Sequence, residues 1–293
     1  IGPAEQVLGI ALDGTGAGTD GTVWGGEVMI ASLSGFTRMA HLKPWRLPAG
    51  MASVRDARRN AFSLLHSCEL LDHPGARMLV EGLSEAERAV TATMIERGLN
   101  SPLTSSMGRL LDAMAAMLGI CLNATYEGEP AIMLEAAAWR ALGTDDARRA
   151  HDRADGFGYR FALQEQPVSA PDEQTRQRRS RVGEHAIDQV IELDPAPMVR
   201  AALDDLMAGR PVEAIAADAQ AVCDASIQIA RRSGIRNVAL SGGVFMNRLL
   251  LGEALQRLRA EGLRPLAPSA VPVNDGCIAF GQAAVARRRL CER

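Results

Sequence analysis

Two acidic residues that sit beside glycines are the first candidates for chemistry in this sequence. Asp13 follows the apolar run 7–12 and opens a stretch, ending at Glu27, that is rich in glycine, threonine and aspartate. Asp275 precedes Gly276 in a second turn-like stretch. Carboxylates held by such turns can bind a divalent cation that in turn binds phosphate. A plain glycine-rich hairpin turn around Asp13 and a helix N-cap at Asp275 are the alternatives.

A glycine pair near the end of the chain marks a second candidate site. Ser241, Gly242 and Gly243 follow the short apolar run 238–240 and open a helical segment that includes Asn247. Free N–H groups at a helix N-terminus favour an anion or a nucleotide, and glycines remove side chains that would block its approach. The Asn247 side chain offers a donor and an acceptor to an adenine edge. Many helices begin after glycine without binding a ligand, and that alternative stays open.

A third candidate lies on a helix predicted to begin near Met107. Apolar residues at 107, 110, 111, 114, 117 and 118 fall on one face of this helix. Asp112 falls outside that stripe, so it is free to point into a cleft. An ordinary solvated aspartate is the alternative interpretation.

A strand meander and a long helical portion are predicted to position these residues. Residues 7–43 contain three apolar runs joined by short turns, which predicts an antiparallel meander within 1–48. The portion 49–234 is predicted to be mainly helical, with one long alanine-rich helix over 212–232. Within it, residues 165–184 are polar and rich in Arg, Gln, Pro and Ser, which predicts a surface loop.

The last part of the chain, 235–293, is predicted to be a nucleotide-binding unit. A short strand at 238–240, a helix, a second strand at 263–267 and a final helix at 278–289 follow one another. A strand–helix–strand unit of this length implies parallel pairing with a right-handed crossover. Open α/β sheets bind ligands at the carboxyl ends of their strands, where the glycine-containing turns of this unit fall.

Composition limits the class of protein further. The 293 residues include 32 Lys and Arg against 35 Asp and Glu, a net charge of −3 that argues against a nucleic-acid partner. No apolar stretch reaches the roughly 18 residues that a membrane span needs, and no signal peptide is visible. The 5 cysteines are scattered without a C-x-x-C pair, which fits a reducing cytoplasm and gives no zinc ribbon.

Several sequence blocks resemble the carbamoyltransferase region of HypF, a family of hydrogenase maturation proteins. They read LDGTG…DGTVWGGE at 12–27, TSSMGRLLDA at 104–113, YEG at 126–128, LSGGVFMNR at 240–248 and DG…GQA at 275–283. The blocks stand in the family's order, and together they span nearly the whole chain. Antibiotic O-carbamoyltransferases and TsaD-like threonylcarbamoyl transferases share a related core and are the nearest alternatives.

The resemblance implies an α/β fold, an actin-like ATPase (ASKHA) lobe with a three-stranded antiparallel meander, parallel strands and a large helical portion. Residues 1–293 would then form a TsaD-like carbamoyltransferase region. The implied activity is ATP-dependent carbamoyl transfer from carbamoyl phosphate through a carbamoyl-adenylate. The implied acceptor is the C-terminal cysteine of a HypE-like protein in nickel–iron hydrogenase maturation. A sugar kinase on the same fold and a non-catalytic nucleotide-binding remnant remain alternatives.

The resemblance also assigns roles to the candidate residues. Asp13 and Asp275 would be catalytic and would hold a divalent metal, either iron, zinc or magnesium. Thr15 and Gly16 would face the phosphates of ATP. The remaining nucleotide-binding residues would be Gly242, Gly243 and Asn247, with Asn247 near adenine, and Asp112, Gly128 and Glu135 near the ribose.

The chain departs from the family pattern at several positions. Met133 replaces an expected glutamate, Ala219-Gln220 replaces a Phe-His pair, Met51 replaces an acid and Ala17 replaces a tyrosine. The family's paired-histidine motif, which supplies further metal ligands, is expected upstream of residue 7. Because the chain starts at Ile1, we expect a fragment whose metal site is incomplete.

Overall fold

The computed structural model describes residues 5–143, 158–167, 189–218 and 223–291. Within these ranges the strands are β1 (Val7–Ala17), β2 (Val23–Ser32), β3 (Gly35–Leu42), β4 (Trp45–Arg46), β5 (Leu103–Thr104), β6 (Ala162–Pro167), β7 (Gln189–Asp194), β8 (Asn237–Ser241) and β9 (Arg264–Leu266). They form one sheet whose main path runs in the order β6-β7-β3-β2-β1-β8-β9. Strands β4 and β5 pair with each other, and β5 also pairs with β2.

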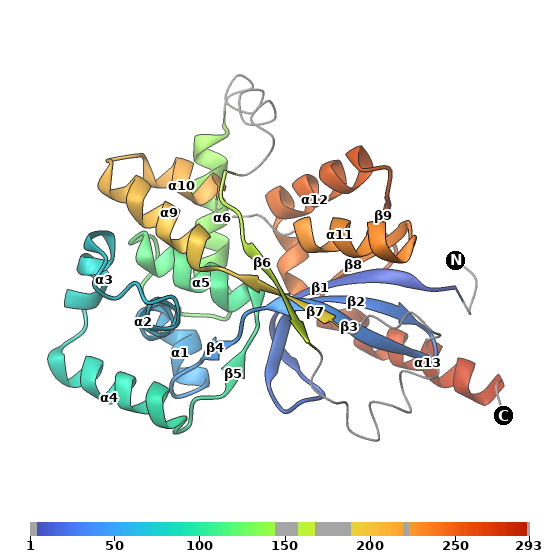
Figure 1. Ribbon diagram of the computed structural model, residues 1–293, viewed down its shortest axis with the longest axis horizontal. Helices are drawn as coiled ribbons and strands as arrows, with labels where there is room; N and C mark the ends of the chain where they lie inside the picture. Colours follow the sequence, from blue (N-terminus) through green and yellow to red (C-terminus); the bar gives the residue numbers. More distant parts are fainter. Residues whose placement is uncertain (1–4, 144–157, 168–188, 219–222, 292–293) are drawn as a thin grey trace.

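The helices of the described ranges gather on the two sides of this sheet (Figure 1). Most of them lie on one side, in the order α1 (Met51–Arg55), α2 (Ala57–Ser67), α3 (Arg77–Glu81), α4 (Glu85–Arg97), α5 (Met107–Met117), α6 (Glu129–Ala141), α9 (Ala196–Met207) and α10 (Val212–Asp218). Near β8 and β9 lie α11 (Asp224–Ser233) and α12 (Arg248–Ala260), and the chain ends with α13 (Ile278–Cys291). In the part of the chain that the structure describes, no helix has the length and apolar character needed to cross a bilayer.

The predicted antiparallel meander is confirmed in β1, β2 and β3. Leu8, Ile10 and Leu12 of β1 are at most 1% exposed, and the residues between them are half-buried. This alternation follows from the geometry of a strand, in which successive side chains point to opposite faces. Strand β2 pairs antiparallel with both β1 and β3, so the three apolar runs become one continuous piece of sheet.

The predicted parallel unit is also confirmed at the other side of β1. Residues Leu8 to Ala11 of β1 pair in parallel with Val238 to Ser241 of β8, and β9 pairs in parallel with β8. The carboxyl ends of β1 and β8 therefore meet at one edge of the sheet. Strand β8 lies between β1, which carries Asp13, and β9, which precedes Asp275.

Two expectations for the helical portion were wrong in detail. Strands β6 and β7, which we did not predict, form an antiparallel pair, and β7 also joins β3 in parallel. The predicted loop 165–184 begins inside β6, and its remainder lies outside the described residues. Most of β6 is exposed at the edge of the sheet, so its composition is that of a loop although backbone pairing makes it a strand.

The single helix expected over 212–232 is instead assigned as two helices, α10 and α11. The first packs against α6, whereas the second packs against β1 and β3. Cys223, which directly precedes α11, is not helical. The residues between the helices, 219–222, lie outside the described ranges, as does the Ala219-Gln220 departure from the family pattern.

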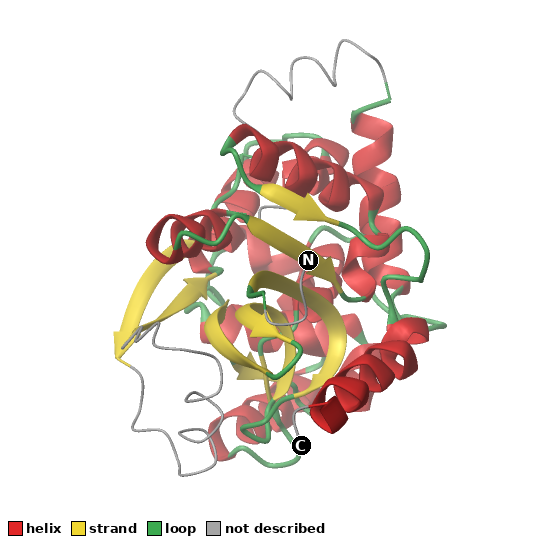
Figure 2. Cartoon of the chain, turned by 90° about the vertical axis from the view of Figure 1, so that its right-hand side faces the viewer, coloured by secondary structure: helices red, strands yellow, loops and turns green. Residues whose placement is uncertain are grey.

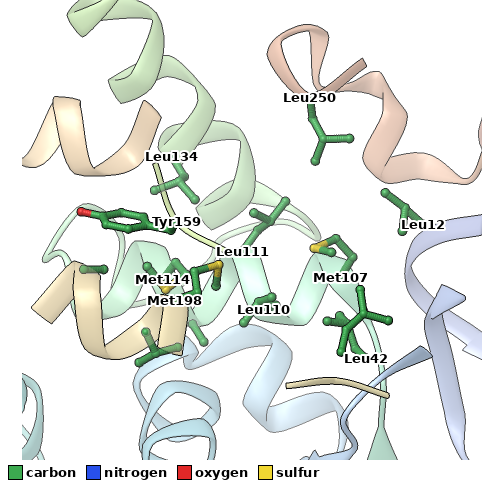
Figure 3. Packing of buried hydrophobic residues seen from close by; sticks show 14 of the residues in the cluster. Leu12, Leu42, Met107, Leu110, Leu111, Met114, Leu134, Tyr159, Met198 and Leu250 are labelled. Atoms are coloured by element: carbon green, nitrogen blue, oxygen red, sulfur yellow. The ribbon is translucent and has the colours of Figure 1, made fainter. Parts of the chain in front are cut away.

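One apolar core joins the sheet to the helical portion, with α5 at its centre. Every residue of α5 is buried, as expected for a helix covered on all sides. In Figure 3, Met107 at the start of α5 lies toward Leu12 and Leu42 of the sheet. The rest of the helix lies toward Leu134 of α6 and Met198 of α9. Figure 2 shows how the other helices pack around the twisted strands.

A buried ion-pair network connects the β1–β2 hairpin to β3 and to the residues before α5. Glu27 Oε1 accepts hydrogen bonds from Arg38 Nη2 at 2.9 Å and from Ser105 Oγ at 2.5 Å. The Arg38 guanidinium carbon lies 4.2 Å from the Trp24 ring centroid, and Arg38 Nη1 pairs with Asp20 at 3.1 Å. We call Glu27, Arg38, Ser105, Trp24 and Asp20 the hairpin network. It fixes the hairpin against the start of α5, where the candidate site begins.

Candidate functional site

A cavity of about 400 Å³ lies where β1, α5, α6 and the segment before α12 meet. The first wall consists of Asp13 and Gly14 from β1 and Gly108, Arg109 and Leu111 from α5. The second wall consists of Glu127, Gly128, Ala131, Ile132 and Glu135, at and beside the start of α6. The third consists of Gly243, Val244 and Met246 from the 3-10 turn η2 (Gly243–Met246), together with Asn247. Its volume is within the range of small-molecule sites.

The first wall owes its shape to an irregularity in β1. Leu12 pairs with Gly26 and Gly16 pairs with Trp24, so residues of β1 between these pairs bulge out of the ladder. A bulge can re-aim a side chain away from its regular position, and here it carries Asp13 to the rim of the cavity. The glycine-rich stretch therefore contains a bulge within β1 as well as the turn between β1 and β2.

The start of α5 is held tightly against this bulge. The Ser106 hydroxyl caps the helix by accepting from the Arg109 N–H at 3.1 Å, and it lies 2.7 Å from the carbonyl oxygens of Asp13 and Gly14. A β-carbon at Gly108 would lie 2.8 Å from Gly14 Cα, which is closer than side chains allow. Glycine at 108 thus lets α5 approach β1 and places the helix beside the cavity.

The Asp13 carboxylate is oriented by its own loop. Its Oδ1 accepts from the Gly14 N–H at 2.7 Å and would lie 3.3 Å from a β-carbon at Gly243. The Asn274 β-carbon would lie 4.0 Å from that same position. Asp13 and the 274–275 turn therefore approach Gly243 together, although β8 separates their strands.

The third wall depends on a strained backbone at Gly242. This residue has φ +103°, and a β-carbon there would lie only 2.0 Å from the Leu12 carbonyl oxygen. Its N–H donates to the Val273 carbonyl at 2.9 Å, which ties η2 to the segment before Asp275. Only glycine suits this backbone conformation and this close approach.

Asn247 is the N-cap residue of α12. Its Oδ1 caps the helix by accepting from the Leu250 N–H at 3.0 Å, and the residue is 8% exposed. One lone pair of the predicted adenine acceptor is therefore used within the protein. The residue nevertheless lines the cavity.

The second wall is linked across the cavity to α12. Gly128 caps α6 with a left-handed backbone at φ +82°. Glu135 Oε1 accepts from the Arg248 N–H at 2.8 Å and from Trp139 Nε1 at 3.3 Å. Glu135 therefore lines the cavity and also connects α6 to the start of α12.

Arg109 and Asp112, which we call the cleft pair, are buried beside the first wall. Each is 1% exposed, and Arg109 Nη2 lies 2.9 Å from Asp112 Oδ2. Burial raises the pKa of Asp112 to about 6, while Arg109 and the Ala131 backbone N–H oppose that rise. Asp112 is thus neither solvated nor part of the cavity lining, which corrects both interpretations made from its position on the helix.

The predicted site residues fall into two groups in the structure. The residues that line the cavity are Asp13, Gly128, Glu135, Gly243 and Asn247. Those that lie outside its lining are Thr15, Gly16, Asp112, Gly242 and Asp275. Of the second group, Gly242 and Asp112 lie directly behind the walls, whereas Thr15 and Asp275 are exposed.

The donor set for a metal is incomplete in the described ranges. No three His, Cys, Asp or Glu side chains come together there in a way that could hold an ion. Asp13 is already bonded to the Gly14 N–H, and Asp275 starts the exposed 3-10 turn η3 (Asp275–Cys277). The residues present do not by themselves make a metal site, and we derive no chemical step through a metal.

Several lining residues were not predicted from the sequence. Arg109 and Glu127 bring charge to the cavity, and Ile132, Val244 and Met246 bring apolar surface. A signal for Arg109 exists, because it stands three residues before Asp112, the spacing of an ion pair on one helix face. The three apolar residues carry no such signal, since their sequence cannot be told from that of a core segment.

Comparisons with known proteins point to one protein family. Residues 9–282 match the family profile described as "Carbamoyltransferase, Kae1-like Domain, second subdomain". The carbamoyltransferase HypF homolog of Cupriavidus necator is 36% identical over 292 residues, which cover 97% of this chain and 66% of that protein. Carbamoyltransferase HypF of Rhizobium leguminosarum bv. viciae is 33% identical over 290 residues, 96% of this chain and 32% of that protein. The chain therefore spans about two thirds of one relative and about a third of the other.

Solved structures give the same result for the fold. A crystal structure of full-length HypF in the phosphate- and nucleotide-bound form matches with a TM-score of 0.78 at 30% identity, covering 98% of this chain and 40% of that one. The crystal structure of T. kodakarensis HypF matches with a TM-score of 0.72 at 28% identity, covering 98% of this chain and 34% of that one. The expectation of an actin-like ATPase fold is confirmed.

Proposed function

The chain belongs to the HypF carbamoyltransferase family, and we propose that its cavity binds ATP for carbamoyl transfer from carbamoyl phosphate. The observation that carries this proposal is the meeting of Asp13, Arg109 and the Gly243–Asn247 segment around one cavity. The cavity lies at the carboxyl ends of the parallel strands β1 and β8. Ligands of open α/β sheets bind at such an edge.

The cavity lining offers both kinds of surface that a nucleotide needs. Ile132, Val244 and Met246 offer apolar surface to a purine ring. Arg109 Nη2, beside Gly14, offers a cation to the phosphates. In this arrangement Asn247 would lie near adenine, and Gly128 and Glu135 near the ribose.

The proposed reaction begins with carbamoyl phosphate and ends with a carbamoylated thiol. Water hydrolyses carbamoyl phosphate to carbamate and inorganic phosphate, and one carbamate oxygen then attacks the α-phosphorus of ATP while pyrophosphate leaves. A cysteine thiolate of a HypE-like acceptor, at its C-terminus, then attacks the carbamoyl carbon of the carbamoyl-adenylate and AMP leaves. Positioning of the two substrates by backbone and side-chain contacts is the main contribution that this chain would make.

A divalent metal, either iron, zinc or magnesium, belongs to the same proposal. Asp13 and Asp275 would each give it one carboxylate, and the remaining donors would have to come from substrate or from another segment. When bound, such an ion would act as a Lewis acid and a template for phosphate.

A cytoplasmic location is also part of the proposal. The described cysteines, Cys68, Cys121, Cys223 and Cys277, are all free thiols. Free thiols are typical of reducing compartments.

The test is carbamoyl-phosphate-dependent exchange of labelled pyrophosphate into ATP by the intact protein. We expect exchange in the wild type and its loss in Asp13→Asn and Asp275→Asn. Asp72→Asn makes the same change at an exposed site remote from the cavity lining and should leave exchange intact. Nucleotide binding without exchange in the wild type would instead support a non-catalytic nucleotide-binding protein.

A further inference from the structure

The cleft pair combines deep burial with unused hydrogen-bonding capacity. Among the described residues, no group makes a hydrogen bond with Arg109 Nε or Nη1. The Ala131 backbone N–H approaches the Asp112 carboxylate, but neither Asp112 oxygen has a well-aligned hydrogen-bond donor there. The Nη2–Oδ2 approach of 2.9 Å is therefore an ion contact without hydrogen-bond alignment. A buried charge that lacks aligned partners is unfavourable, and native proteins keep such groups where they serve another purpose.

The position of Arg109 Nη2 shows which part of the guanidinium reaches the cavity wall. Arg109 lines the cavity, whereas Asp112 does not. A β-carbon at Gly14 would lie 3.3 Å from Arg109 Nη2 and 3.6 Å from Glu127 Oε1. The guanidinium therefore faces the bulge that carries Asp13, and the exposed Glu127 carboxylate stands close to it.

The backbone of α5 is fixed independently of this pair. The Arg109 N–H bonds Ser106, and the Arg109 carbonyl accepts from Asn60 Nδ2 at 2.6 Å. Asn60 in turn accepts from Trp45 Nε1 at 3.0 Å. The cleft pair is thus not needed to hold the start of α5, and its ion contact is left to orient the Arg109 side chain.

We propose that Arg109 is the residue that binds phosphate oxygens of the nucleotide, and that Asp112 is a positioning residue that acts through Arg109. This inference rests on the proposed nucleotide binding. A guanidinium N–H makes a strong, charge-assisted hydrogen bond to a phosphate oxygen. Arg109 Nη2, which lies beside Gly14 at the first wall, is the nitrogen assigned to the ligand, because Nε and Nη1 are enclosed by protein. The Asp112 contact holds Nη2 in that place. The expected ribose contact of Asp112 is replaced by an indirect effect on the phosphates.

The test compares the binding of ATP and of adenosine to the intact protein by titration calorimetry. Arg109→Gln should weaken ATP binding by about tenfold or more, because charged hydrogen bonds are lost, and should change adenosine binding less than about twofold. Asp112→Asn should weaken ATP binding less than Arg109→Gln does. The double variant should bind ATP no more weakly than Arg109→Gln alone, because Asp112 acts through Arg109.

Adenosine and 2′-deoxyadenosine distinguish a ribose contact of Asp112 from a positioning role. If Asp112 touched the ribose, Asp112→Asn would reduce the preference for adenosine over 2′-deoxyadenosine. We expect that preference to be unchanged, and a reduced preference would overturn the assignment of Asp112. Unchanged ATP binding in folded Arg109→Gln would overturn the assignment of Arg109.

Glu127→Gln tests the inference without altering a buried residue. Removing the exposed Glu127 carboxylate should tighten ATP binding about two- to fivefold, because this carboxylate repels the negatively charged phosphates of ATP. The binding of adenosine, which carries no phosphate, should not change. Glu96→Gln, an exposed change on α4, is the matched control and should change neither ligand. Unchanged ATP binding in Glu127→Gln contradicts the inference even if Arg109→Gln fails to fold. A wild type that binds neither ATP nor adenosine contradicts the proposed function itself.

Discussion

The hairpin network and the cleft pair are both buried ion pairs, but they differ in how their charges are satisfied. In the network, Glu27 Oε1 accepts from two side chains, and Oε2 accepts from the Gly25 and Gly26 N–H groups at 2.7 and 2.8 Å. Arg38 leaves its Nε without a hydrogen bond from the described residues. The cleft pair leaves Arg109 Nε and Nη1 in that condition, and the Asp112 carboxylate has only the poorly aligned Ala131 N–H beside its contact with Arg109.

This difference separates a structural role from a ligand-binding role. The network is completed by groups of the chain itself, so its energy is available as soon as the hairpin, β3 and the start of α5 come together. In the cleft pair, Arg109 lines a cavity and Asp112 lies behind its wall, and we infer that a ligand in the cavity supplies the partner that Arg109 lacks. The same residue types, one arginine and one acid, therefore do different work according to what surrounds them.

The largest expected effect is on the hairpin network. Glu27→Leu leaves Arg38 buried without its main counter-charge and leaves two backbone N–H groups without an acceptor. We expect the free energy of unfolding to fall by about 3–5 kcal/mol in urea titrations. Glu96→Leu, the same substitution at an exposed site, should change it by less than about 0.5 kcal/mol.

A second variant shows whether the loss comes from the unpaired charge. Glu27→Leu combined with Arg38→Met removes both charges, and it should recover part of the stability lost in Glu27→Leu. A double variant as unstable as the sum of the two single variants would mean that the two side chains do not act as a pair.

The next effect concerns His41, which lies beside the network and pairs with Glu27 across β2 and β3. Burial lowers the pKa of His41 to about 4, and nearby Arg38 adds to that shift. Because the folded-state pKa lies below the unfolded value, protonation favours the unfolded chain. Stability is therefore full above about pH 6.5 and falls toward pH 4.

We expect the wild type to lose about 3 kcal/mol relative to His41→Gln between pH 7 and pH 4. The measurement is the difference in unfolding free energy between the two proteins at each pH. His66→Gln removes a half-buried histidine of α2 away from the network and serves as the control. If the unfolding free energies of the wild type and His41→Gln differ by the same amount at every pH in this range, His41 is not held neutral in the folded protein.

Asp112 should respond to pH in the opposite direction. Its folded-state pKa of about 6 lies above the unfolded value, so the folded chain binds the proton more tightly. Stability from this group is present at low pH and is lost as pH rises from about 4 to about 6. Relative to Asp112→Asn, the wild type should lose about 2–3 kcal/mol over that range, measured by the same titrations. If the difference in unfolding free energy between the wild type and Asp112→Asn does not change with pH, the cleft pair is solvated.

The sequence predicted the elements around these two regions better than their internal contacts. The meander and the strand–helix–strand unit follow from apolar runs and turn residues, which are local features. Strand β6 was missed because an exposed edge strand has the composition of a loop. Strand β7 lies inside the sheet, between β6 and β3, and was missed because it is short and its place there depends on β3, which lies far away in the sequence.

The candidate site also combines residues that local sequence predicts with contacts that it does not predict. Asp13, Gly243 and Asn247 were predicted from a local pattern of glycines and polar residues beside strand ends, and all three line the cavity. Arg109 was not predicted, because only the packing of α5 decides that Arg109 lines the cavity while Asp112 lies behind its wall. Side chains that meet across elements, such as Glu135 and the Arg248 N–H, leave no mark in local sequence.

The smallest expected effect is at the exposed rim of the hairpin network. Asp20 is 44% exposed and pairs with Arg38 at 3.1 Å, while Glu27 is 2% exposed and pairs with the same guanidinium at 2.9 Å. Water and salt screen the outer pair, so Asp20→Asn should lower the free energy of unfolding by no more than about 1 kcal/mol. Raising the salt concentration to about 1 M should shrink that difference, because the Debye length falls to about 3 Å. A loss as large as that of Glu27→Leu would mean that the network is organised around Asp20 rather than around the buried carboxylate.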